Sequence, residues 1–332
     1  MAGCLLAWEL QQRTYQVHLI HHPDIAAASS VAAGLINPVT GQRLVLQEDI
    51  EQLLPFAQKT YRALERALHH RFYFPCPIWR TLTREREQQA WQKRQNNPIY
   101  TAYLQPHPQH EHTLIQQHSG YVDTAPLCHH IRQALRNQGK VEEQVFQYEA
   151  LQHHERGVSY QHLHAKRIIF CEGWRGMNNP YFSHLPFQPA QGEILDIHTD
   201  SPHPKHITHQ GTWLIPTHDG RLRLGASYNN TPPFHEHTTS QAATQLLYAL
   251  ENMPIQLKSV RIAQQQAGIR PNTRDKQPFL GFLPHRPNIG IFNGFGSKGS
   301  MLIPYHAHAM AMHIQQHTPL PTSSDIQRFP CV

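Results

Sequence analysis

Gly3 is the first residue whose type and position could serve the binding of a ligand. It lies in the helical stretch MAGCLLAWEL, and an apolar, β-branched run at 15–20 follows it closely. A helix that leads into a buried strand is the second half of a βαβ unit. Such a unit binds a dinucleotide through glycines at the strand-to-helix turn, where the backbone approaches the pyrophosphate. Gly3 fits the last glycine of that fingerprint; the alternative is that it serves packing alone.

Histidine and cysteine are the other residues that could support chemistry, as metal ligands or redox groups. The 28 histidines fall in pairs and triplets, most of them in polar, Pro- and Gln-rich sequence without carboxylates or thiolates at fixed spacing. The 5 cysteines are scattered and form no CxxC pair. We therefore expect neither a metal site, nor a disulfide framework, nor a zinc knuckle.

Length and charge limit the class of protein. A chain of 332 residues can hold one large domain or two smaller ones. It has neither a long apolar run nor the pattern of a signal peptide, so we expect a soluble, cytoplasmic protein without a membrane partner. The net charge of +6 leaves room for an anionic partner, but the basic residues form no Lys/Arg block.

The pattern of elements predicts parallel sheet near both ends and antiparallel sheet between them. Helical periodicity covers 48–70 and 124–139, and a short apolar run at 167–171 reads as a buried parallel strand. From Gly192 the character changes, with a hairpin turned at Asp219-Gly220 and a helix at 240–252. We expect two interleaved domains, each built from non-contiguous segments.

Three stretches carry a resemblance to a known family. They are ASSVAAGLINPVTGQR at 28–43, IIFCEGWRG at 168–176, and the pair GIRPNTRDKQPFLG and NGFGSKGSMLIP near the C-terminus. With them the chain resembles the FAD-dependent oxidoreductases of the D-amino-acid oxidase and glycine oxidase family. That resemblance includes the oxidase half of the bifunctional enzymes that modify the wobble uridine of tRNA. It runs over nearly the whole chain and is thin from about 72 to 115.

The resemblance implies an α/β fold, in which an FAD-binding, Rossmann-like parallel sheet domain of the glutathione-reductase type is interleaved with an antiparallel substrate domain. The FAD-binding domain would comprise residues 1–71, 116–180 and 266–332, and the substrate domain 72–115 and 181–265. The first strand and the first two glycines of the fingerprint would precede Met1. We expect Met1 to be an internal methionine; the alternative is a degenerate member that binds flavin poorly.

The resemblance also assigns roles to particular residues. Arg270 would hold the substrate carboxylate, and Lys298 would stabilise negative charge on the flavin. Without the resemblance, Arg270 could instead be structural, paired with Asp275 or Glu193. The implied cofactor-binding residues are Gly3, Ser29, Ser30, Ala33, Gly34, Gly173, Gly294, Gly296, Ser297 and Gly299.

Two departures from the family pattern concern the cofactor and the substrate. Ile20 is followed by His21 and His22 rather than by the acidic residue that holds the ribose. Ser297 stands where glycine oxidase has a second arginine facing the carboxylate, so the substrate preference of that enzyme cannot be transferred.

The reaction implied is oxidation of the C–N bond of an amino acid or secondary amine by hydride transfer to FAD, with a small molecule as substrate. One alternative is an oxidase that acts on a carboxymethylaminomethyl-modified tRNA base, with which the pI of about 9.1 agrees. A second alternative is a truncated, non-catalytic flavoprotein.

Overall fold

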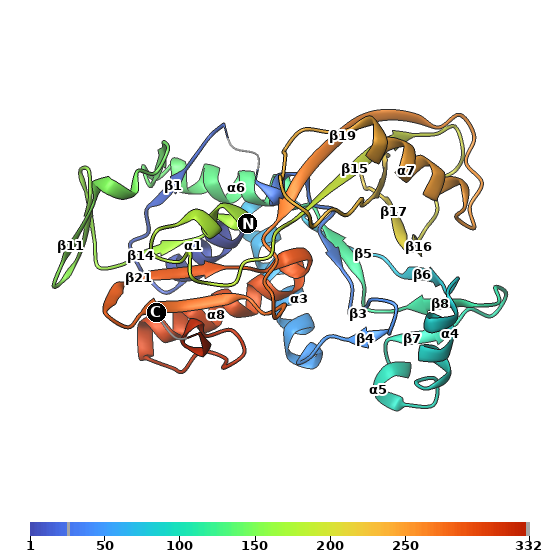
Figure 1. The fold of residues 1–332 in the computed structure, drawn as a ribbon, viewed down its shortest axis with the longest axis horizontal. Coiled ribbons are helices and arrows are strands. Elements are labelled where there is room, and N and C mark those ends of the chain that lie inside the picture. The colour runs from blue at the N-terminus through green and yellow to red at the C-terminus, as the bar shows by residue number, and fades with distance from the viewer. Residues whose placement is uncertain (25–26, 330–332) are drawn as a thin grey trace. The chain divides into compact units, whose positions relative to one another are not determined.

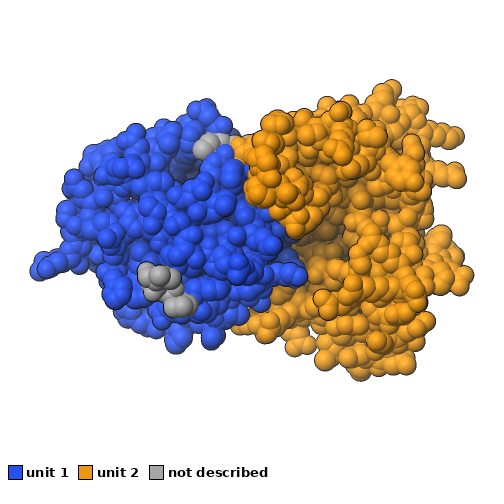
Figure 2. Space-filling model, in the orientation of Figure 1, with its two compact units in different colours: residues 1–30, 125–190, 269–332 blue, residues 31–124, 191–268 orange. Residues whose placement is uncertain are grey.

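The chain divides into two compact units, each built from separated segments (Figures 1 and 2). The computed structural model describes residues 1–24 and 27–329, so Cys331 lies outside the described residues. Unit 1 comprises 1–30, 125–190 and 269–332, and unit 2 comprises 31–124 and 191–268. The FAD-binding domain expected from the sequence also includes 31–71 and 116–124, which group here with unit 2. The functions expected of the two domains stay predictions.

Unit 1 contains the parallel strands expected from the sequence. β1 pairs in parallel with β10, and β14 pairs in parallel with β21, whose other edge carries the antiparallel β20. A separate antiparallel sheet has the order β11–β12–β13. The bounds are β1 (Leu19–His21), β10 (Val141–Glu143), β11 (Leu151–His154), β12 (Gly157–Tyr160), β13 (Leu163–Ala165), β14 (Ile168–Phe170), β20 (Phe279–Leu283) and β21 (Arg286–Asn293).

Two long helices pack on one another in unit 1. α1 (Ala2–Gln12) and α8 (Gly299–Gln316) share an extensive contact, and α1 also touches β21. Apolar side chains recur along α8 at Ala307, Met310, Ala311 and Ile314, all of them buried. The remaining helices are α6 (Thr124–Arg136), which runs into unit 1, the short α2 (Ala28–Val31), and the 3₁₀ helices η1 (Tyr148–Ala150), η2 (Gly173–Asn178), η3 (Gly296–Lys298) and η4 (Ile326–Arg328).

Unit 2 is built on an eight-stranded sheet of order β19–β15–β18–β17–β16–β6–β8–β7. The pairs whose register is known in this sheet are antiparallel except β16 with β6, so the expected change of character after Gly192 is confirmed. The bounds are β6 (Ile78–Thr81), β7 (Leu104–Pro106), β8 (Thr113–Gln116), β15 (Ala190–His198), β16 (Ile207–Gln210), β17 (Thr212–Pro216), β18 (Leu222–Gly225) and β19 (Arg261–Arg270). Leucines on β15, β17 and β18 pack against α7 (Ser240–Glu251).

The segment 31–71 belongs to unit 2 because of its pairing partners. β2 (Leu35–Ile36) pairs with β9 (Gly120–Val122), which also pairs with β5 (Tyr73–Pro75). The amphipathic helix α3 (Ile50–Leu68) contacts β5. The other elements of this unit are β3 (Val39–Thr40), β4 (Val45–Leu46), α4 (Glu85–Gln92) and α5 (Pro98–Thr101).

The described residues contain neither a metal-binding group of three His, Cys, Asp or Glu side chains nor a helix with the length and apolar character needed to cross a membrane. The cytoplasmic location expected from the sequence stays a prediction.

Candidate functional site

A glycine loop joins β21 to α8 and packs on the segment that follows Arg270. Gly294 and Gly296 have φ of +79° and +52°, a region that L side chains rarely adopt. The N–H of Gly296 donates to the carbonyl of Pro271 at 3.2 Å. A Cβ on Gly296 would lie only 2.6 Å from Asn272 Oδ1, closer than real Cβ contacts come. The two C-terminal stretches singled out in the sequence therefore meet in unit 1.

Asn293 ties this loop to the turn after β14. Its side chain is almost fully buried; Nδ2 donates to the carbonyl of Gly173 at 2.8 Å, and Oδ1 accepts from the N–H of Gly294 at 2.8 Å. The turn at Gly173 (φ +63°) and the turn at Gly294 are thus held by one amide group. A Cβ on Gly173 would meet nothing within 4 Å, so this turn borders open space.

Glu172, beside that turn, is a partly buried carboxyl whose two oxygens both accept hydrogen bonds. It accepts hydrogen bonds from the hydroxyl of Tyr148 and from Asn179 Nδ2, the latter at 2.7 Å. Burial raises the pKa of Glu172 above its ordinary value, and the two hydrogen bonds oppose that shift. Burial also raises the pKa of the neighbouring Cys171 thiol to about 12, so this thiol is kept neutral.

Gly3 lies where α1 approaches two strands. A Cβ on Gly3 would lie 3.2 Å from Cys171 Cβ and 3.8 Å from Leu19 Cδ1. The close approach expected of Gly3 is therefore present between helix and strands. The Met1 ammonium donates to Ser29 Oγ at 3.1 Å, and Ser30 Oγ donates to the carbonyl of Ala27 at 2.7 Å.

Ala33 and Gly34 belong to unit 2, unlike the other ten predicted site residues. Gly34 has a φ of +66°, and a Cβ there would lie 1.8 Å from the carbonyl oxygen of Val122. Gly34 thus has a reason to be glycine that does not involve a cofactor. Ala33 lines a small polar pocket with Tyr121 and Asp123. The approach of flavin to Ala33 and Gly34 stays a prediction.

Ser297 and Lys298 directly precede α8, and Arg270 directly precedes the residue that contacts the glycine loop. Arg270 is the last residue of β19 and is partly exposed. Lys298 is the N-cap of α8; burial, with a smaller contribution from the charge of Lys276, lowers its pKa below the ordinary lysine value. Ser297 is exposed on the loop, and a Cβ on Gly299 would press on the side chain of Ile303.

The sequence alone did not identify Asn293 as a residue of this site. The only local signal for it was its place before the first glycine of NGFGSKG. The two carboxylates considered as partners of Arg270 are engaged with other groups as well. Asp275 accepts from Arg328 Nε at 2.9 Å, and Glu193 accepts from Gln265 Nε2 at 2.7 Å.

Comparison with known proteins identifies the family of the chain. The family model "FAD dependent oxidoreductase" (DAO) matches residues 1–312. The glycine oxidase of Bacillus subtilis is 29% identical over 153 residues, which are 42% of this chain and 38% of that protein. The chain spans about a third to two fifths of the length of the first curated relatives it matches.

Solved structures show the same fold over almost the whole chain. The glycine oxidase of Geobacillus kaustophilus superposes with a TM-score of 0.79 at 17% identity, covering 99% of this chain and 95% of that one. The iminodiacetate oxidase of Chelativorans sp. BNC1 superposes with a TM-score of 0.75 at 16% identity, covering 97% and 95%. The expected fold, with parallel strands in one part and an antiparallel sheet in the other, is confirmed. The chain belongs to the DAO family of FAD-dependent oxidoreductases.

Proposed function

We propose that this chain binds FAD in unit 1 and oxidises the C–N bond of an amino acid or secondary amine whose carboxylate is held by Arg270. The observation that carries the proposal is the contact between the glycine loop and the segment after Arg270, made by the Gly296 N–H and the Pro271 carbonyl at 3.2 Å. This contact places the backbone that follows Arg270 beside the glycine loop and the start of a long helix, α8. The relatives named for oxidation of glycine and of iminodiacetate support the substrate class.

The residues present fit FAD. α1 and α8 both begin without a side-chain hydrogen bond to their caps, so backbone N–H groups of their first turns are not satisfied by a capping side chain. Such helix starts attract phosphate and developing negative charge. Gly3 and Ser29 would hold the pyrophosphate, and Gly173, which borders open space, would leave room for the ring system beside it.

FAD, when bound, supplies the acceptor for the two electrons removed from the C–N bond. The chain itself positions the substrate and the charge around it. The Arg270 guanidinium can donate two parallel hydrogen bonds to a carboxylate and so fix the amine relative to the loop. Lys298 and the first amides of α8 place positive charge beside the glycine loop.

The role of Arg270 predicts a specific kinetic effect. In Arg270→Ala, KM for a carboxylate substrate such as glycine or sarcosine should rise about 100-fold, which corresponds to about 2.8 kcal/mol. The corresponding amide cannot form the charged pair and should be affected much less. Arg270→Lys should recover only part of the loss, because an ammonium lacks the two-donor fork. Arg274→Ala, which removes an exposed arginine four residues later, is the matched control and should behave as wild type.

Two results would contradict this proposal. If Arg270→Ala and Arg274→Ala had the same KM for the carboxylate, Arg270 would not hold the substrate. If the chain bound FAD but gave no turnover with any amine, the reading as a non-catalytic flavoprotein would hold instead.

Lys298 predicts a second, separate effect on catalysis. The pKa of Lys298 lies below the ordinary lysine value, so Lys298 loses its positive charge at a lower pH. The fall of kcat at alkaline pH should therefore occur at a lower pH than the titration of an ordinary lysine would give. Lys298→Arg should move this fall to higher pH, and Lys298→Met should lower kcat with little change in KM. A pH profile of kcat that is the same in all three proteins would exclude Lys298 from the chemistry.

A further inference from the structure

Basic side chains follow the exposed face of α3 in unit 2. Lys59, Arg62 and Arg66 are exposed and stand at i, i+3 and i+7, so they share one face of the helix. His69, exposed at the C-cap, continues the same face. Arg71 follows the helix end and is exposed. We name these five residues the α3 basic stripe.

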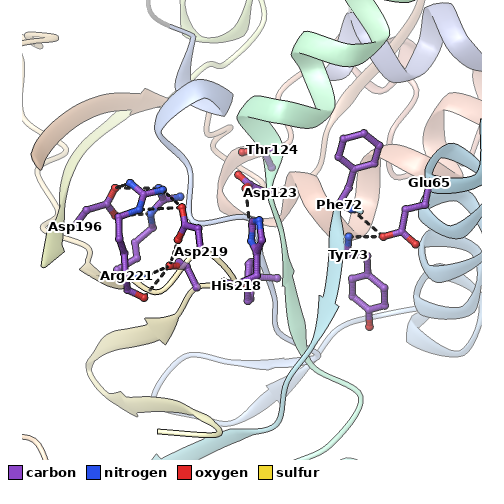
Figure 3. A network of polar contacts seen from close by, with 12 residues as sticks. Glu65, Phe72, Tyr73, Asp123, Thr124, Asp196, His218, Asp219 and Arg221 are labelled. Carbon is purple, nitrogen blue, oxygen red and sulfur yellow. Dashed lines mark hydrogen bonds and ion pairs between the residues drawn. The ribbon is translucent and has the colours of Figure 1, made fainter. Parts of the chain in front are cut away.

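Glu65 lies on α3 between Arg62 and Arg66, and its carboxylate faces the backbone of the segment that follows the helix. Glu65 Oε1 accepts from the N–H groups of Phe72 and Tyr73, at 2.9 and 2.8 Å (Figure 3). Among the described residues, Arg62, Arg66 and Arg71 form no ion pair with a carboxylate. The stripe therefore presents its positive charge outward, with Glu65 occupied at its base.

Most of the stripe borders a shallow, open surface, and its last arginine packs on an aromatic ring. Arg62, Arg66, His69 and Arg71 line an open depression of about 460 Å³, together with Glu65 and His70. The Arg71 guanidinium lies 4.7 Å from the centre of the Phe74 ring, an arrangement that restricts the side chain. A ligand that binds here meets a guanidinium that has already lost part of its freedom.

Helix stabilisation does not account for the whole stripe. Cations near a helix C-terminus interact favourably with the free carbonyls, but that effect fades beyond the last turn. Arg66 and His69 lie within its reach. Lys59 and Arg62 precede Leu68, the last residue of α3, by nine and six residues, and so lie outside the last turn. The interaction with the helix end therefore does not explain the placement of Lys59 and Arg62.

We propose that the α3 basic stripe binds the phosphate backbone of a nucleic acid. A basic stripe along a helix in a chain of pI about 9.1 is the electrostatic pattern of such a surface. The large hydrophobic side chains that are exposed in the described residues, such as Val45 and Ile99, all lie off α3. That surface therefore lacks the apolar anchors that a membrane or a protein partner uses. The proposal goes beyond the oxidase proposal and does not depend on it.

The test measures binding of a fluorescein-labelled RNA stem-loop, and of a DNA hairpin of the same sequence, by fluorescence anisotropy. The stripe variant is Arg62→Gln/Arg66→Gln/Arg71→Gln. The matched control is Arg84→Gln/Arg86→Gln/Lys93→Gln, which removes the same charge from exposed residues in and beside α4. Melting curves verify that all three proteins are folded. The salt concentration is varied from about 50 to 200 mM.

Wild type should bind at low salt, with an affinity that falls steeply as salt rises. Loss of three phosphate contacts should reduce the slope of log K against log salt by about 2 to 3. The stripe variant should therefore bind at least tenfold more weakly at low salt, and the control should keep the wild-type slope. The affinities for the RNA stem-loop and the DNA hairpin show which nucleic acid the protein binds more tightly.

Three results would overturn the proposal: no binding of either probe at low salt, equal losses in the stripe variant and the control, or binding of anionic lipid vesicles in preference to both probes. Turnover of a small amine substrate, measured in parallel, should be unchanged in the stripe variant. Failure of nucleic-acid binding is thereby distinguished from failure of the oxidase proposal.

Discussion

Replacing Asn293 by alanine tests whether one side chain holds the two turns of the candidate site. The change removes both the donor to the Gly173 carbonyl and the acceptor of the Gly294 N–H. The N–H of Gly294 is buried, and leaving such a group unpaired costs about 1–3 kcal/mol. The Gly173 carbonyl is partly buried and adds about 0.5–1.5 kcal/mol.

The free energy of unfolding should therefore fall by about 2–4 kcal/mol in Asn293→Ala. At a denaturant slope of about 3 kcal/mol per M, this is a shift of the urea midpoint of roughly 1 M. Urea titration followed by circular dichroism and by tryptophan fluorescence measures it, and the slope must match wild type. Affinity for FAD should fall in the same variant, because both turns border the proposed cofactor site.

Asn137→Ala is the matched control, because Asn137 is exposed just beyond α6 in the same unit. Its free energy of unfolding should lie within about 0.5 kcal/mol of wild type. Asn293→Asp keeps the acceptor for the Gly294 N–H and replaces the donor to Gly173 by a second acceptor, so it should recover only part of the loss. If Asn293→Ala were no less stable than Asn137→Ala, the hydrogen bonds of Asn293 to the two turns would make no net contribution to the free energy of unfolding.

Three further predictions concern residues whose environments differ sharply. Gly34→Ala should prevent folding of unit 2, because its Cβ would lie 1.8 Å from a carbonyl oxygen. The control Gly41→Ala, at φ +70° in open space, should lower the free energy of unfolding by only about 1–2 kcal/mol. Soluble yield and melting temperature measure both variants. The folded pKa of Glu172 is raised, so its contribution to stability is full below its unfolded pKa and is lost as pH rises through the folded value. Glu172→Gln should thus gain stability relative to wild type as pH increases in urea titrations, and an unchanged difference would exclude this. Glu87→Gln should destabilise by about 3–5 kcal/mol, because Arg80, 2.8 Å away and buried, loses its counter-charge; a melting temperature equal to wild type would contradict that.

Elements with a strong local pattern were predictable. The apolar periodicity of 48–70 predicts a helix, which is present as α3 (Ile50–Leu68). The pair Asp219-Gly220 predicts the turn between β17 and β18, where Gly220 has a φ of +80°. Each of these signals is contained in a short window. The long helix α8 begins at Gly299 and includes Pro304, a residue that is unfavourable inside a helix and obscures its pattern in the sequence.

Features set by distant partners were not predictable in detail. The run at 15–20 was expected to be a strand, but only Leu19–His21 forms one, since the pairing with β10 covers three residues. The segment 31–71 groups with unit 2 because β2 pairs with β9, more than eighty positions later. No local pattern contains that pairing.

The candidate site shows the same limit. The resemblance brought Arg270 and the glycine loop together, and the contact between Gly296 and Pro271 is present in the structure. Asn293 escaped notice because its partner at Gly173 is 120 residues away. The small size of Gly34 was ascribed to the flavin, whereas the structure supplies a backbone neighbour that already requires it.

The central claim is that FAD is held by the glycine loop and the starts of α1 and α8. Hydrogen–deuterium exchange with and without saturating FAD tests it most directly, because it reports on the backbone N–H groups that would bind the cofactor. The account predicts slower exchange in peptides covering 1–6 and 294–302, and unchanged exchange in α7 (Ser240–Glu251). Unchanged exchange at 294–302 with FAD bound, or protection confined to unit 2, would contradict it.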